Sequence, residues 1–148
     1  MEIELPNDFK EFLKLLNSYQ VEYLLIGDFA VGYHGYPRAT NAMDVWVAVN
    51  LANADRLVAA LHEFGFAGSG ISADLFLEDK KVIRMGHPPM RIEVLTGISG
   101  VDFAACYVQR IVGEIDGIPV NIINLGDLKQ NKRASGRYKD LDDLEHLP

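Results

Sequence analysis

Two short apolar runs that lie close together in the chain, residues 23–26 and 45–49, strongly limit how this sequence can fold. Each run has the length and composition of a buried strand. Between them, Gly27 allows a tight turn into a short helix near residues 29–33, and Pro37 excludes regular helix from the loop that follows. The segment therefore predicts a strand, a turn, a short helix, a loop and a second strand.

Four further segments have apolar residues at helical spacing. They are residues 9–16, 57–64, 125–134 and 139–147. The first three are preceded by an asparagine suited to cap a helix, namely Asn7, Asn50 or Asn53, and Asn124. Gly65 and Gly136 are expected to end the second and third of these helices.

Five further segments have the composition of strands. They are residues 75–77, 82–85, 91–95, 108–115 and 118–123. The first two flank a polar turn and predict a hairpin, and the last two are joined by Asp116-Gly117, a strong hairpin signal. Strands outnumber the helices that regular βαβ winding needs. We therefore expect one α/β domain over residues 1–148, of the α+β kind, with helices flanking a mixed sheet.

Composition and charge exclude several classes of protein. A hydrophobic fraction of 49% with 24% charged residues is typical of a globular domain, and Cys106 is the single cysteine, which excludes an internal disulfide. No apolar run approaches the ~20 residues of a membrane-spanning helix, so no membrane partner is expected. The acidic start of the chain lacks a signal-peptide pattern and favours a cytoplasmic location. The net charge of −7 argues against broad binding to DNA.

The segment from the first apolar run to the second resembles the core of the nucleotidyltransferase superfamily. The matching residues are Gly27 at the turn, Arg38 and Thr40 in the loop, and Asp44 at the entrance of the second strand. The resemblance is closest to small stand-alone members of abortive-infection and toxin–antitoxin systems. It implies a nucleotidyltransferase-like fold and Mg²⁺-dependent transfer of a nucleotide from a nucleoside triphosphate to a protein, RNA or small acceptor.

Two positions depart from the family pattern, which has Gly-Gly at the turn and Asp-x-Asp on the strand. Asp28 replaces the second glycine and Ala42 replaces the first aspartate. Ala42 has no ligand atom for a metal, and Asp28 places negative charge where the family brings the triphosphate. If Asp28 replaced the missing carboxylate, it would do so from a turn, whereas the family's aspartate lies on a strand. The resemblance therefore implies impaired activity.

The resemblance also implies which residues carry the chemistry. Asp44 and Glu93, the latter on the 91–95 strand, are its candidate catalytic residues and Mg²⁺ ligands, because nucleotidyl transfer needs a divalent metal between carboxylates and the triphosphate. Alternation along the strand predicts that both face one cleft, with Ala42 on the same side and Asp28 at the rim. Taken singly, each acid is also compatible with a solvated strand position.

A basic C-terminal run, Lys-Arg … Gly-Arg-x-Lys-Asp-x-x-Asp-Leu over residues 132–144, is a second match to the same small nucleotidyltransferases. It implies that Lys132, Arg137 and Lys139 reach nucleotide phosphates. The other candidate nucleotide-binding residues are Gly27, Asp28, Arg38 and Thr40. The alternative is a solvated helix surface with pairs such as Lys139 with Asp143. As exposed charges, Lys132 and Lys139 are expected to contribute little to stability.

Two functional hypotheses follow from these matches and departures. The first is a nucleotidyltransferase whose activity is impaired by Ala42 and Asp28. The second is a catalytically inactive module of a toxin–antitoxin or phage-defence system that binds a nucleotide or a protein partner.

Overall fold

The computed structural model describes residues 3–68, 70–87 and 90–148, and it contains a six-stranded mixed sheet in the order β3-β4-β2-β1-β6-β5. The strands are β1 (Tyr23–Ile26), β2 (Ala42–Val47), β3 (Val82–Met85), β4 (Arg91–Leu95), β5 (Ile111–Ile115) and β6 (Ile118–Ile122). The helices are α1 (Asn7–Ser18), α2 (Gly27–Tyr33), α3 (Leu51–Leu61), α4 (Phe103–Val108), α5 (Leu125–Ser135) and α6 (Tyr138–His146). A π-turn over His62–Phe66 and a 3₁₀ turn over Ala73–Phe76 complete the regular elements of the described chain.

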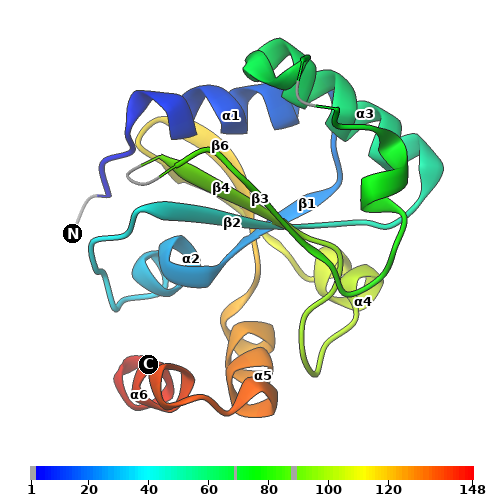
Figure 1. Ribbon diagram of the computed structural model, residues 1–148. Helices are drawn as coiled ribbons and strands as arrows, with labels where there is room; N and C mark the ends of the chain where they lie inside the picture. The colour runs from blue at the N-terminus through cyan, green and yellow to red at the C-terminus, as the bar shows by residue number, and fades with distance from the viewer. Residues whose placement is uncertain (1–2, 69, 88–89) are drawn as a thin grey trace.

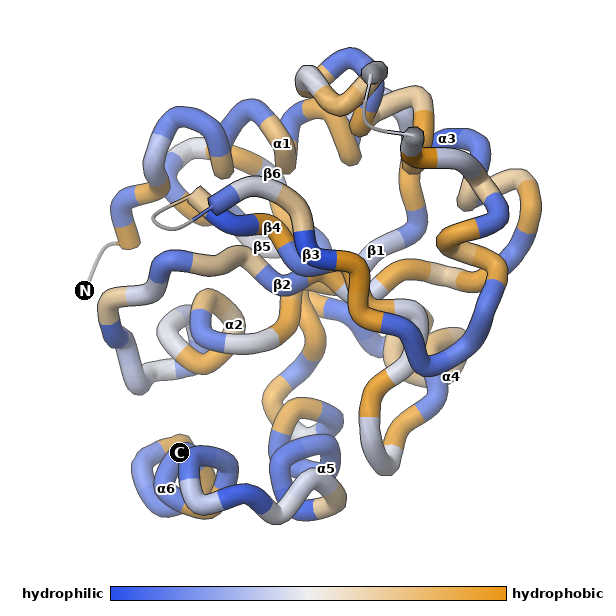
Figure 2. Tube along the Cα trace, viewed as in Figure 1, coloured by the Kyte–Doolittle hydropathy of each residue, from blue (hydrophilic) through white to orange (hydrophobic). Residues whose placement is uncertain are grey.

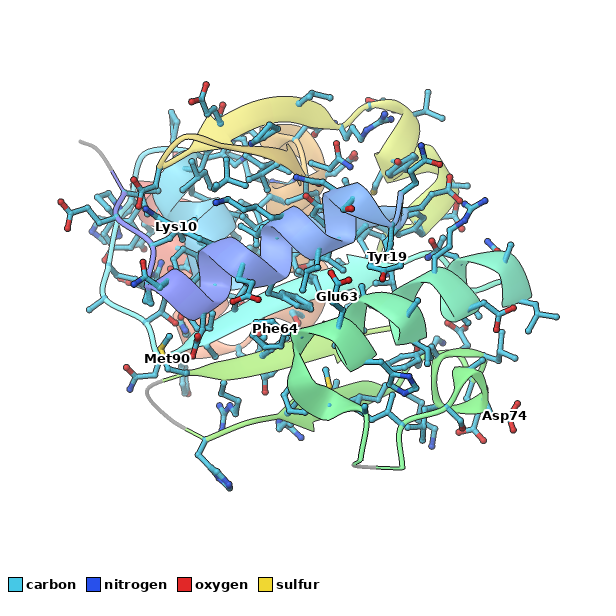
Figure 3. The ribbon with its side chains drawn as sticks, turned by 90° about the horizontal axis from the view of Figure 1, so that it is seen from above. Lys10, Tyr19, Glu63, Phe64, Asp74 and Met90 are labelled. Carbon is cyan, nitrogen blue, oxygen red and sulfur yellow. The ribbon has the colours of Figure 1, made fainter. Side chains whose placement is uncertain are left out.

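The helices flank the sheet on both sides, as the sequence predicts (Figure 1). Helices α1 and α3 cover one face, whereas α2, α5 and α6 lie on the other side. Seen from above, α1 and α3 run side by side, and the Tyr19 hydroxyl at the end of α1 donates to Glu63 Oε1 at 3.2 Å (Figure 3). No helix in the described ranges is long and apolar enough to cross a membrane.

The core fills the space between the sheet and these helices. All four residues of β1 are buried, because helices cover both of its faces. Phe9 and Phe12 of α1 are fully buried against the sheet. In Figure 2 the hydrophobic residues of α1 lie along the side of the helix that faces the sheet. Burial of this apolar surface is the main stabilising contribution to the fold.

Several local predictions are confirmed at the ends of elements. The Asn50 and Asn124 side chains accept hydrogen bonds from the first turns of α3 and α5. Gly136 ends α5 in the left-handed conformation, with φ of +66°. Asp116 and Gly117 both have positive φ in the two-residue turn between β5 and β6, which is the geometry that such a hairpin favours. Asn7 is the first residue of α1 instead of its cap.

One predicted strand is wrong and a second is wrong in part. Residues 75–77 do not pair with residues 82–85, because Ala73–Phe76 forms a 3₁₀ turn that buries Phe76, and β3 pairs with β4 instead. The Thr96 hydroxyl, just after β4, donates to Glu78 O at 2.7 Å and accepts from Lys81 N at 2.8 Å. These bonds tie the 78–81 turn to β4.

The strand predicted from residue 108 begins only at Ile111. Residues Phe103–Val108 form the short helix α4, and the Asp102 side chain caps it by accepting from Ala105 N at 3.1 Å. The cap satisfies a backbone donor in the first turn, and this local interaction favours the helix over an extended strand. Cys106 is buried in this helix, as expected.

Candidate functional site

Strands β2 and β4 bring the two candidate catalytic acids together. They are parallel neighbours, and Asp44 pairs in register with Glu93. Ala42 lies two residues before Asp44 and so shares its face of the sheet. A cleft of about 320 Å³ opens here, and its lining includes Gly27, Asp28, Thr40, Ala42, Asp44, Arg91, Glu93, Lys132, Arg137 and Lys139. The structure thus places both acids and Ala42 in one cleft, with Asp28 beside them.

Gly27 is needed at the turn for two physical reasons. Its φ of +68° lies in the left-handed region, which side chains disfavour. A β-carbon at this position would also lie 2.3 Å from Asp44 Oδ2, so the carboxyl group of Asp44 rests directly over the glycine. The position of the Asp44 carboxyl group therefore depends on a glycine at position 27.

Asp44 and Glu93 have pKa values shifted in opposite directions. Burial, followed by hydrogen bonding and charge repulsion from Glu93, raises the pKa of Asp44 to about 8. The hydrogen bond from Asp44 lowers the pKa of Glu93, and Arg84 and Arg91 add to this effect although burial opposes it. The two carboxyl groups therefore titrate as a pair, and Asp44 holds a proton more tightly than Glu93 does.

The acid pair fits one Mg²⁺ ion. Mg²⁺ in phosphate-transfer sites is usually held by one or two carboxylates together with phosphates and waters. Asp44 Oδ1 is buried and has no hydrogen-bond partner among the described residues, so it is an oxygen available to a cation. The described residues contain no group of three or more histidine, cysteine, aspartate or glutamate side chains placed to hold a metal.

Asp28 faces the cleft but is already paired with cations. Its Oδ1 lies 2.9 Å from Lys139 Nζ and 3.5 Å from Arg38 Nη1. A carboxylate held in this way is a poor substitute for the ligand that Ala42 lacks. Lys139 pairs with Asp28 instead of with Asp143, the partner that helical spacing suggests.

The three C-terminal cations of the cleft differ in burial. The Lys139 and Arg137 side chains are 57% and 74% exposed, whereas the Lys132 side chain is only 7% exposed. Lys132 Nζ lies 2.8 Å from Asp143 and 3.3 Å from Asp140, and both of these acids are buried. The expectation that Lys132 is an exposed charge is therefore wrong, because it neutralises two buried carboxylates.

Arg38 and Thr40 have structural contacts beside the cleft. Arg38 pairs with Asp143 as well as with Asp28, and it is absent from the cleft lining. The Thr40 hydroxyl bonds to both the backbone N and O of Ala42, at 3.2 and 3.1 Å, and so fixes the start of β2.

Sequence reasoning missed two arginines that surround Glu93. Arg84 Nε lies 2.7 Å from Glu93 Oε1, and Arg91 Nη2 lies 3.8 Å from the same oxygen. Arg91 lies two residues before Glu93 on β4, so alternation alone was enough to place it on the cleft face. Arg84 is opposite Glu93 only because β3 pairs with β4, which the sequence did not predict.

This strand order, with helices on both sides of the mixed sheet and the acids on neighbouring strands, defines a nucleotidyltransferase-like fold. A protein from Thermotoga maritima, provisionally assigned as a nucleotidyltransferase, has a similar structure with a TM-score of 0.60 and 13% identity, over 93% of this chain and 88% of that one. An antigenic nucleotidyltransferase-like protein from Paracoccidioides brasiliensis gives a TM-score of 0.55 and 19% identity, over 96% of this chain and 76% of that one. No family model and no curated protein matches the sequence. At such low identities the likeness establishes the fold.

Proposed function

We propose that this protein binds a nucleoside triphosphate with one Mg²⁺ ion in the cleft, and that it is a nucleotidyltransferase with an impaired transfer step. One observation carries the proposal. A carboxylate pair, Asp44 and Glu93, shares a cleft with Lys132, Arg137 and Lys139. A triphosphate bound between a metal and a cationic wall is neutralised from both sides, which is the electrostatic requirement of phosphoryl-type transfer.

The residues of the cleft have distinct parts in this proposal. Asp44 and Glu93 hold Mg²⁺, which neutralises charge on the triphosphate. Arg137 and Lys139 are exposed enough to turn toward phosphate oxygens. The charge of Lys132 is balanced by Asp140 and Asp143, so this residue supports the wall from beneath by holding α5 and α6 together.

Two features limit the transfer step. Ala42 removes a carboxylate from the face that holds the metal, and the described residues offer no replacement cluster for a second ion. Asp28 occupies Lys139 at 2.9 Å, so an internal carboxylate competes with phosphate for this cation. The protein should therefore bind a triphosphate more readily than it transfers a nucleotide from it.

The absence of a carboxylate at position 42, where the chain has alanine, also favours a second candidate function. In this alternative the cleft binds nucleotide without catalysis, and the protein acts through a partner in a toxin–antitoxin or phage-defence module. The two candidates share the binding site and differ only in turnover, with a protein, an RNA or a small molecule as acceptor in the first.

Calorimetry tests the shared part of both candidates. ATP, GTP, CTP and UTP are titrated into the protein with and without Mg²⁺, and the same titrations are made with Asp44→Asn. We expect binding that requires Mg²⁺ and weakens at least tenfold in Asp44→Asn, because the metal loses a charged ligand. Asp55→Asn, on the exposed side of α3, is the matched control and should bind as the parent does.

Two results would count against the proposal: no heat with any triphosphate in the presence of Mg²⁺, or equal affinities for the parent and Asp44→Asn. Transfer of label from α-labelled triphosphate then separates the two candidates. Incorporation above a heat-denatured control supports the enzyme, and its absence despite binding supports the inactive module.

A further inference from the structure

A second hollow of about 430 Å³ adjoins the cleft, and its volume lies in the ~300–1,000 Å³ range of small-molecule sites. Three segments form its walls: the N-terminal residues 3–6, helix α2, and the loop from Pro37 to Thr40. Ile3, Phe29 and Pro37 give it a largely apolar surface. Asp28 and Thr40 line both the hollow and the cleft, so the two spaces meet at these residues.

The walls of this hollow are held by contacts outside it. Leu5, in the N-terminal wall, is buried, and its backbone N donates to Asp116 Oδ2 at 2.9 Å. Lys10 Nζ pairs with the same carboxylate at 3.1 Å. Phe29 packs edge-on against Phe9, with ring centroids 5.7 Å apart. These contacts hold the walls in place, which lowers the entropic cost of binding.

The charges around the hollow disfavour an anionic occupant. Glu4 and Asp28 both line it. Arg38 also lines it, but its terminal nitrogens already pair with Asp28 and Asp143. A nucleoside seated here would have to carry its α-phosphate past the Asp28 carboxylate to reach the metal ligands. Repulsion opposes that path, whereas a hydroxyl group passing Asp28 would donate a hydrogen bond to it.

We propose that this hollow, lined by Ile3, Glu4, Phe29, Gly32, Pro37 and Arg38, binds the acceptor, and that the acceptor is a small, uncharged or cationic molecule with an apolar body and a hydroxyl group. The inference rests on the proposed function, because it supplies the second substrate of that reaction. The hydroxyl oxygen forms a bond to the α-phosphorus, and the bond from that phosphorus to the bridging oxygen breaks. Pyrophosphate leaves with the electron pair, and the hydroxyl proton passes to solvent.

Gly32 offers a way to fill the hollow without disturbing the cleft. It lies inside α2 and is not among the glycines with positive φ, so a side chain causes no backbone strain there. A β-carbon at this position would make ordinary contacts, 3.5 Å from Pro37 Cα and 3.6 Å from Ile3 Cδ1. Gly32→Leu should therefore block the hollow. Gly126→Leu, at an exposed site on α5 whose β-carbon would contact only Asn124 Oδ1, at 3.5 Å, is the control.

The test uses tyramine, which has a phenol hydroxyl and an ammonium group, and 4-hydroxyphenylacetate, which has the same ring with a carboxylate. Titration of ¹⁵N-labelled protein should shift the amides of Phe29, Gly32 and Ala39 with tyramine. Binding should be at least tenfold weaker for 4-hydroxyphenylacetate, and at least tenfold weaker for tyramine in Gly32→Leu. Gly126→Leu should bind tyramine as the parent does, and ATP–Mg²⁺ should bind equally to all three proteins.

Four results would overturn the inference: no tyramine shifts at these amides, equal binding of the anionic probe, unchanged tyramine binding in Gly32→Leu, or loss of ATP–Mg²⁺ binding in Gly32→Leu. Because the amide shifts are mapped on the parent protein, the test does not depend on the folding of the variant. If tyramine binds as expected but the parent fails to bind any triphosphate, the hollow stands as a binding site and the proposed function fails. Loss of ATP binding in Gly32→Leu alone assigns the hollow to the nucleotide and overturns the acceptor site.

Discussion

The buried lysine of the C-terminal motif should contribute strongly to stability, and replacing Lys132 with methionine tests this. Methionine keeps an unbranched apolar side chain of similar length, so the substitution removes the charge with little change in packing. It leaves the buried carboxylates of Asp140 and Asp143 without their shared cation, which lies 3.3 and 2.8 Å from them. The unfolded chain is not affected in this way, because water solvates both acids there.

The size of the effect follows from burial and from the partners that remain. Removing one member of a buried ion pair costs about 3–5 kcal/mol, because a buried charge is left uncompensated. Asp143 keeps Arg38, and Asp140 keeps Arg137 at 2.8 Å, so we expect the lower end, about 3 kcal/mol. For a chain of this length, 1 kcal/mol shifts the melting temperature by about 2–4 °C, which gives a fall of about 6–12 °C.

Urea and thermal unfolding followed by circular dichroism measure this change directly. Arg133→Met is the matched control, since Arg133 lies on the exposed side of the same helix and should change stability by less than about 0.5 kcal/mol. If Lys132→Met unfolds within that same margin of the parent, Lys132 is not the neutralising partner of the two buried acids. The role assigned to the C-terminal helices would then be wrong.

Three further predictions concern the cleft. Asp28→Asn should tighten Mg²⁺–triphosphate binding roughly fivefold at low salt, because Lys139 loses its ion pair with Asp28 and is free to bind phosphate. Titrations at two salt concentrations should show that this gain shrinks as salt rises, and equal affinities of the parent and Asp28→Asn contradict the competition. Ala42→Asp should raise the rate of nucleotide transfer, measured with labelled triphosphate, whereas the rate of the parent should stay below the ~1–10³ per second of typical enzymes. A parent rate within that range contradicts the inference that Ala42 impairs transfer. The affinity for Mg²⁺ should rise as the pH increases toward about 8, because the metal binds the deprotonated form of Asp44. Calorimetry between pH 6 and 8 measures this, and an affinity that does not change with pH contradicts the raised pKa of Asp44.

The fold was predictable from sequence where local signals and burial agree. Runs such as residues 23–26 are apolar throughout and become β1 with helices on both faces. Caps such as Asn50 and Asn124 act within one helical turn, and the Asp116-Gly117 hairpin depends on two residues. The prediction of a strand at residues 75–77 was wrong, because a short apolar run does not distinguish a strand from a turn that buries one side chain. There the tertiary contact of Phe76 decided the structure.

The position of the acid pair was predicted from the family resemblance together with alternation on β2, and the pairing of β2 with β4 then brings the two acids into register. The pKa values were not, since they depend on how deeply Asp44 is buried and on Glu93 lying opposite it. The contact between Asp44 Oδ2 and Gly27 likewise depends on the tertiary arrangement, although both residues stood out in the sequence.

The C-terminal motif shows why charge patterns alone mislead about the role of a residue. In the sequence, Lys132 and Lys139 look alike, and both were assigned to phosphate. In the structure, Lys132 is enclosed because α6 folds back beside α5 and brings Asp140 and Asp143 over it, whereas Lys139 stays exposed and reaches Asp28. One motif thus supplies both a buried ion-pair network that holds the two helices together and an exposed cation at the cleft. A substitution that weakens nucleotide binding through Lys132 therefore acts through the packing of α5 and α6, and within this motif Lys139 and Arg137 are the residues that can report direct phosphate contact.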